Sequence, residues 1–168
     1  YAERLFDFPE IGPLLEPAAR VAIAKPAQDQ GVAVTEDALE RIVLETRGYP
    51  YFLQEWGKHA WDSAAASPIT LADVDRASQA AVAALDESFF RVLFDRLTPA
   101  EKRYLRAMAQ LGTGPHRSGD IADQLGRKVT SLGPTRNQLI AKGMIWSPNH
   151  GDTAFTVPLF DEFMLRIM

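Results

Sequence analysis

The sequence predicts a mainly α-helical protein built from two modules, and three observations support this prediction. Apolar residues recur at helical spacing along most of the 168 residues. Helix-start residues and helix-stop glycines divide the chain into short segments. The charge also changes sign: residues 1–94 hold 8 Lys and Arg against 15 Asp and Glu, whereas residues 95–168 hold 10 against 7. This change of sign indicates two modules with different partners.

The first half is expected to be a bundle of four or five helices. Apolar spacing predicts a helix over residues 14–25. Pro26 should end this helix, because its ring cannot continue the hydrogen-bond ladder. Thr35 is a suitable N-cap for a second helix, which Gly48 should end.

Two further helices and a connection are predicted next. Pro50 suits the first turn of a helix over about 50–65. Thr70 is expected to cap a helix that runs to about Leu85. An amphipathic helix within residues 86–97 should then connect the two modules.

The second half changes from helices to a β-hairpin. Three helices are predicted, beginning at Thr98, at about Gly119, and near Thr130 or Ser131. Two β-prone runs, 144–147 and 154–157, then flank a turn rich in Pro, Asn, Gly and Asp, and a last helix closes the chain. Three helices followed by a hairpin predict the winged-helix form of the helix-turn-helix.

A winged helix of this kind has candidate residues for contact with duplex DNA. Its third helix would enter the major groove, while the turn before it and the hairpin would meet the backbone. The alternative is a winged helix that serves only as a packing module, since a net charge of +3 over 95–168 is modest. The candidates for DNA contact are Arg127, Lys128, Thr130, Ser131, Arg136, Asn137, Lys142 and His150.

Composition excludes several other functions. The chain has no Cys, so thiolate catalysis and zinc–cysteine sites are excluded. His59, His116 and His150 show no metal-ligand spacing, and no Gly-rich phosphate loop or nucleophile motif is present. No apolar run is long enough to span a membrane. We therefore expect a cytoplasmic chain that catalyses nothing alone and, since it begins with Tyr, a fragment of a longer protein.

The stretch TRGYPYFLQEWGKHAW, residues 46–61, suggests a ligand-facing turn. Gly48 should end one helix and Pro50 start the next, so the turn would present backbone N–H groups at a helix N-terminus. Tyr49, Tyr51 and Phe52 would add flat apolar surface on which a base could pack. The alternative is an ordinary helix–helix turn backed by an aromatic core.

The order of these segments resembles the C-terminal part of bacterial AAA+ P-loop ATPases, in particular ATP-binding proteins akin to archaeal ATPases, signal-transducing NTPases and origin-recognition type initiators. GYPYFLQ (48–54) carries the resemblance most specifically. ERLFDF (3–8), LTPAEKRYLRAMAQLG (97–112) and LIAKGMI (139–145) support it.

The resemblance implies a helical lid over residues 1–85, in which 1–12 are a remnant of the ATPase core, followed by a winged-helix domain over 98–168. It places Gly48, Tyr49 and Pro50 near the nucleotide. ATP with magnesium would be held by a core absent from this chain, which alone should bind no cofactor. The implied partners are that core and either double-stranded DNA or, alternatively, a protein or a second copy of the chain.

One feature departs from the pattern of this family. Many such lids place an arginine at the start of the helix that here begins Pro50-Tyr51-Phe52, where it senses the γ-phosphate. Arg47, just before the turn, is only a weak substitute. Phosphate sensing by an arginine of this lid is therefore not expected.

Overall fold

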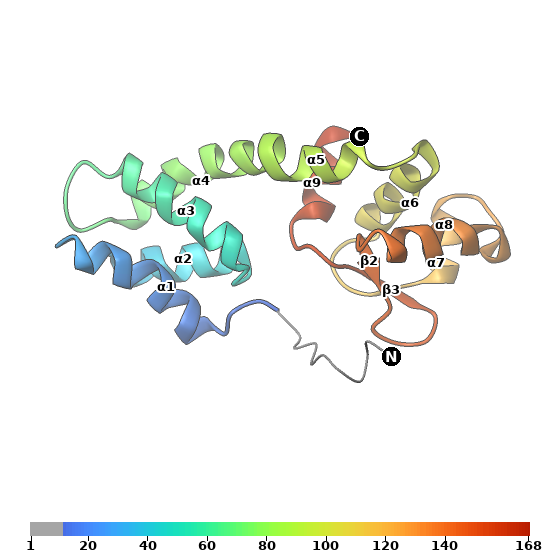
Figure 1. Cartoon of the computed structure of the whole chain (residues 1–168), viewed down its shortest axis with the longest axis horizontal. Coiled ribbons are helices and arrows are strands. Elements are labelled where there is room, and N and C mark those ends of the chain that lie inside the picture. Colours follow the sequence, from blue (N-terminus) through green and yellow to red (C-terminus); the bar gives the residue numbers. More distant parts are fainter. Residues whose placement is uncertain (1–11) are drawn as a thin grey trace, which may run out of the picture. The chain divides into compact units, whose positions relative to one another are not determined.

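The computed structural model describes residues 12–168 and is mainly helical, with one small antiparallel sheet in that range (Figure 1). The chain divides into two compact units at the bond between Val82 and Ala83. The segment 3–8, interpreted from the sequence as the last strand of an ATPase core, lies outside the described residues. The predicted fold class, a helical bundle followed by a winged helix, is confirmed.

The first unit is a bundle in which α1, α2 and α3 pack against one another. Its core is formed by small and apolar side chains from all its helices, among them the fully buried Trp56 and Phe52. A single parallel bridge joins Val34 to Ile69 and ties together the two loops that enclose α2 and α3. The helices are α1 (Glu16–Asp29), α2 (Glu36–Thr46), α3 (Pro50–Ser63) and α4 (Leu71–Leu85).

The prediction that Pro26 ends the first helix is wrong, because α1 continues to Asp29. Proline removes one backbone donor and disturbs the preceding turn, which usually costs about 3 kcal/mol or more. Here Pro26 itself is exposed, whereas the next residue, Ala27, is buried against the bundle. The carbonyl of Ala27 also accepts hydrogen bonds from Gln30 and Val32. Packing and end-capping after the proline thus keep the last turn helical.

A polar network fastens three helices of this unit together. The carboxylate of Glu45 on α2 accepts hydrogen bonds from the indole of Trp56 at 2.6 Å and from the hydroxyl of Ser78 at 2.6 Å. Its other oxygen lies 3.3 Å from Arg41. Because the indole N–H is buried, this acceptor is needed to satisfy it.

Helix α4 continues into a π-helical turn, η2 (Asp86–Phe90), and then into α5 (Arg91–Asp95). The segment 86–97, expected to connect the modules, lies within the second compact unit. Its aromatic side chains explain this placement: Phe90 and Phe94 pack on Phe163, with ring centroids 5.4 and 5.8 Å apart. A wide π-helical turn was not predicted from the sequence.

The second unit has the winged-helix arrangement. Its three-stranded sheet has the order β1-β3-β2 and is antiparallel throughout, with Arg117 opposite Asp152 and Trp146 opposite Ala154. The outer strand β1 was not predicted, because two residues give no detectable alternation. The elements are α6 (Pro99–Gln110), β1 (His116–Arg117), α7 (Ser118–Gln124), α8 (Val129–Ala141), β2 (Ile145–Trp146), β3 (Asp152–Phe155) and α9 (Phe160–Ile167).

The start of α8 differs from the prediction. The N-cap is Lys128, so Thr130 and Ser131 lie inside the first turn and do not cap the helix. The hydroxyl of Ser131 donates to the carbonyl of Lys128 at 2.7 Å. Pro134 lies inside α8. The Thr98 cap, by contrast, is confirmed, because Thr98 and Glu101 form a reciprocal capping box.

Candidate functional site

The Gly-Tyr-Pro turn joins α2 to α3 through two residues with positive φ. Arg47 has φ 51° and Gly48 has φ 71°, the left-handed region that ends many helices. The N–H of Tyr49 then donates to the carbonyl of Thr46 at 3.0 Å. Pro50 follows as the first residue of α3, as predicted. The chain therefore reverses within three residues and keeps both helices in contact.

Gly48 also holds the segment that precedes α1. The N–H of Leu14 donates to the carbonyl of Gly48 at 2.8 Å. A Cβ atom at position 48 would lie 2.5 Å from the carbonyl oxygen of Leu14, closer than real Cβ contacts. Glycine is thus required here twice, for its φ and for the close approach of a second backbone.

The turn is backed and surrounded by apolar side chains. The ring of Tyr49 packs on the buried Phe52 with centroids 4.7 Å apart. Tyr51, on the first turn of α3, is 39% exposed. Two leucines are highly exposed: Leu44, shortly before the turn, at 72%, and Leu15, next to Leu14, at 80%. This end of the first unit therefore presents an apolar surface to its surroundings.

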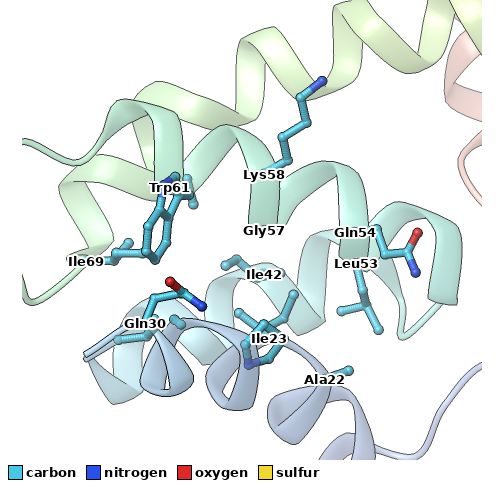
Figure 2. A pocket seen from close by; sticks show the side chains of 14 residues that line it. Ala22, Ile23, Gln30, Ile42, Leu53, Gln54, Gly57, Lys58, Trp61 and Ile69 are labelled. Atoms are coloured by element: carbon cyan, nitrogen blue, oxygen red, sulfur yellow. The ribbon is translucent and has the colours of Figure 1, made fainter. Parts of the chain in front are cut away.

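A separate pocket of about 370 Å³ lies between α1, α3 and the loop that contains Ile69 (Figure 2). Its walls are mostly apolar, and Figure 2 shows Ile23, Leu53 and Trp61 lining it while the amine of Lys58 extends away. Gly57 leaves the space open on α3, because a Cβ there would lie 3.2 Å from Cδ1 of Ile23. The pocket thus lacks a charged group aimed at its interior.

Five of the eight predicted DNA-contact residues are exposed on two consecutive segments of the second unit. Arg127 and Lys128 occupy the turn between α7 and α8, and Thr130, Ser131 and Asn137 lie on α8; all five are exposed. His150 is also exposed, but it lies apart, in the turn between β2 and β3.

Arg136, predicted as a DNA contact, has a guanidinium that already donates hydrogen bonds within the protein. Its guanidinium donates to the hydroxyls of Thr153 at 3.0 Å and Ser147 at 2.9 Å, and to the carbonyl of Asp152 at 3.1 Å. The side chain is half-buried between α8 and the hairpin. Arg136 therefore fastens the β2–β3 hairpin to α8, and its donors are engaged within the protein.

Lys142 is likewise engaged inside the second unit. Its amine lies 2.7 Å from Oε2 of Glu101 and donates to the carbonyl of Arg96 at 3.0 Å. Glu101 is 1% exposed. Burial alone would raise the pKa of this carboxyl, but the hydrogen bonds from Lys142 and Thr98 outweigh it and hold the pKa below its ordinary value. The first role of Lys142 is therefore to neutralise a buried carboxylate.

Three exposed residues of the second unit were not considered in the sequence interpretation. Arg117 lies on β1, Trp146 on β2 at 51% exposure, and Arg103 on α6. In a sequence, an arginine that lines a binding site looks the same as an arginine that only faces solvent. Trp146 carried a detectable signal, since a large aromatic residue beside a turn is unusual on a surface.

Two absences concern residues 12–168 only. No group of three or more His, Asp or Glu residues in this range could hold a metal ion. No helix in the same range combines the length and the apolar character that crossing a membrane requires.

Comparisons with known proteins give a partial picture. A family model described as "Domain of unknown function (DUF8462)" matches residues 87–164. None of the curated proteins matches the chain. Among solved structures, the RuvB Holliday junction branch migration motor of Thermotoga maritima is 18% identical, covers 86% of this chain and has a TM-score of 0.44. A mutant of the same RuvB is 19% identical with the same coverage and TM-score.

The chain spans 47% of the length of these RuvB chains. A likeness this distant assigns no function.

Proposed function

We propose that this chain is the lid and winged helix of an AAA+ ATPase. In this proposal a core outside the chain holds ATP with magnesium, and the Gly48–Pro50 turn closes over the nucleotide. The chain alone catalyses no reaction and holds no cofactor. We expect such a protein in the cytoplasm of a bacterium.

The observation that carries the proposal is the exposed apolar end of the first unit. Leu15 and Leu44 expose most of their surface, and Tyr51 is 39% exposed. Leu15 follows Leu14, whose N–H donates to the carbonyl of Gly48, and Leu44 and Tyr51 flank the turn in the sequence. Exposed apolar surface of this kind is typical of a site that another surface covers. A nucleotide base offers a flat face for Tyr49 or Tyr51, and the ATPase core offers apolar surface for the leucines.

The proposal is tested in the full-length protein with two matched proline variants. Pro50 and Pro99 each occupy the first turn of a helix, in the first and second unit respectively. We expect Pro50→Ala to weaken binding of a fluorescent ATP analogue by about tenfold, a loss of roughly 1.4 kcal/mol. Pro99→Ala should leave this affinity unchanged. Equal affinities for both variants and the parent would contradict a nucleotide-facing turn.

A second proposed role is contact with duplex DNA through the winged helix. It is favoured by the exposed polar and basic surface formed by the α7–α8 turn and the first turns of α8. Arg127 and Lys128 would meet phosphates, and Thr130, Ser131 and Asn137 would face base edges. Arg136 and Lys142 would support this surface from within, and His150 would reach the flanking backbone.

Fluorescence anisotropy with a labelled random duplex tests this role. We expect binding at 50 mM salt that weakens steeply by 200 mM, because phosphate contacts release counterions. The alternative is a winged helix that contacts a protein partner or a second copy of the chain. Absence of binding at 50 mM salt, together with a concentration-dependent increase in mass, would favour that alternative.

A further inference from the structure

The cations of the second unit fall into two groups. Arg106, Arg136, Lys142 and Arg166 are hydrogen-bonded or ion-paired within the unit, and Lys102 lies 3.7 Å over the ring of Phe94. In the part of the unit that the structure describes, the other six cations make no side-chain hydrogen bond, ion pair or ring contact: Arg91, Arg96, Arg103, Arg117, Arg127 and Lys128. Of these six, Arg103 on α6 and Arg127 in the α7–α8 turn line a common pocket.

Arg103 and Arg127 line one pocket. It has a volume of about 80 Å³ and lies between α6, the α7–α8 turn and α8, with Tyr104 and Leu132 among its walls. A buried water needs roughly 10–15 Å³ of such space, so the pocket has room for a group larger than a single water. The half-buried Thr135 also lines it and adds a hydroxyl.

The polar groups of this pocket match a phosphate. Two guanidinium groups and a hydroxyl can all donate to tetrahedral oxygens, and guanidinium is suited to bidentate contacts with phosphate. No Asp or Glu lines the pocket to compete for the arginines. Tyr104 is buried, with 1% of its surface exposed, and contributes to the wall of the pocket.

We propose that this pocket, which we call the arginine pocket, holds one backbone phosphate of a nucleic-acid duplex. The inference rests on the proposed contact with DNA and names the group that the contact engages. The pocket adjoins the first half of α8, where Thr130 and Ser131 are exposed. A phosphate held there would fix the register of α8 against the groove, whereas base edges would be met by other side chains.

The test compares two double variants of this 168-residue chain that remove equal charge. Arg103→Gln/Arg127→Gln empties the arginine pocket of cations. Arg91→Gln/Arg96→Gln is the control, because both side chains are exposed in the same unit and neither lines this pocket. Anisotropy with a labelled 20-base-pair duplex is measured from 50 to 200 mM salt, and thermal unfolding confirms that both variants fold.

The proposal predicts a defined change in the salt dependence. Losing one phosphate contact should reduce the slope of log K against log salt by about 0.9. We expect this reduction, with about tenfold weaker binding at 50 mM salt, for the pocket variant and not for the control. Each single pocket substitution should produce most of the effect, since both arginines would grip one phosphate. A pocket variant that matches its control would overturn the inference while leaving DNA binding intact.

A parent chain that binds no duplex gives a different result, because then the proposed DNA contact fails together with this inference. A titration with inorganic phosphate, followed by NMR of the arginine side chains, then tests whether the pocket binds a free phosphate and not the backbone phosphate of a duplex. Saturable changes in the chemical shifts of Arg103 and Arg127, without duplex binding, would assign the pocket to a free phosphate. They would overturn the proposal that it holds a phosphate of a duplex.

Discussion

Replacing Gly48 by alanine tests whether the turn is built as described. Alanine in the left-handed region costs about 1–2 kcal/mol. The added Cβ would also lie 2.5 Å from the carbonyl oxygen of Leu14. Leu14 precedes α1 and can move away, so the further loss is the Leu14–Gly48 hydrogen bond, worth about 0.5–1.5 kcal/mol. We expect Gly48→Ala to lower the free energy of unfolding of the first unit by roughly 2–3 kcal/mol.

Gly31 provides the matched control. It lies in the same unit with φ 77°, and a Cβ there would meet no atom within 4 Å. Gly31→Ala should therefore show only the backbone term, about 1–2 kcal/mol. Urea unfolding is followed by the fluorescence of Trp56 and Trp61, both in the first unit, with Trp146→Phe to remove the signal of the second unit. Equal midpoints for the two glycine variants would refute the close approach of Leu14.

The remaining predictions concern the second unit. Because the folded-state pKa of Glu101 lies below its ordinary 4.5, its stabilising contribution is complete above that pH and is lost as the pH falls through the lowered pKa. Glu101→Gln should lower the free energy of unfolding at pH 7 and should make this free energy fall less steeply between pH 7 and pH 3, as measured by urea unfolding. The same pH dependence in the variant and the parent would contradict this prediction. Arg136→Ala should destabilise the unit by about 2 kcal/mol and speed amide exchange in β3. The exposed neighbour Asn137→Ala should do neither, and protected β3 amides in Arg136→Ala would show that other contacts hold the wing.

Local signals in the sequence were sufficient for most helices. Thr98 with Glu101 three residues later, and Pro50 after Gly48, are short-range patterns whose energetics do not depend on distant residues, and the structure confirms them. Pro26 shows the limit of such signals. Its local effect opposes a helix, but burial of Ala27 outweighs it, and that burial depends on residues far away in the sequence.

The candidate site shows the same division between local and long-range information. The sequence identified exposed residues of the α7–α8 turn, because cations and hydroxyls cluster there. It could not show that Arg136 faces Thr153 and Ser147 across the hairpin, since this depends on how the wing folds back. Arg103 was overlooked for the complementary reason: the pocket that it shares with Arg127 exists only after α6 and α8 pack together.

The π-helical turn η2 has a consequence for how this protein changes through evolution. The buried positions Ala81, Leu85, Phe90 and Phe94 are separated by four, five and four residues, and the interval of five spans η2. In a regular α-helix, one additional residue after Leu85 would rotate all later side chains by about 100° around the helix axis. The wide turn absorbs that residue. Relatives with one residue fewer between Leu85 and Phe90 should therefore have an unbroken α-helix and keep the same aromatic positions inside, so a gap in an alignment here would mark a tolerated insertion and not a change of fold.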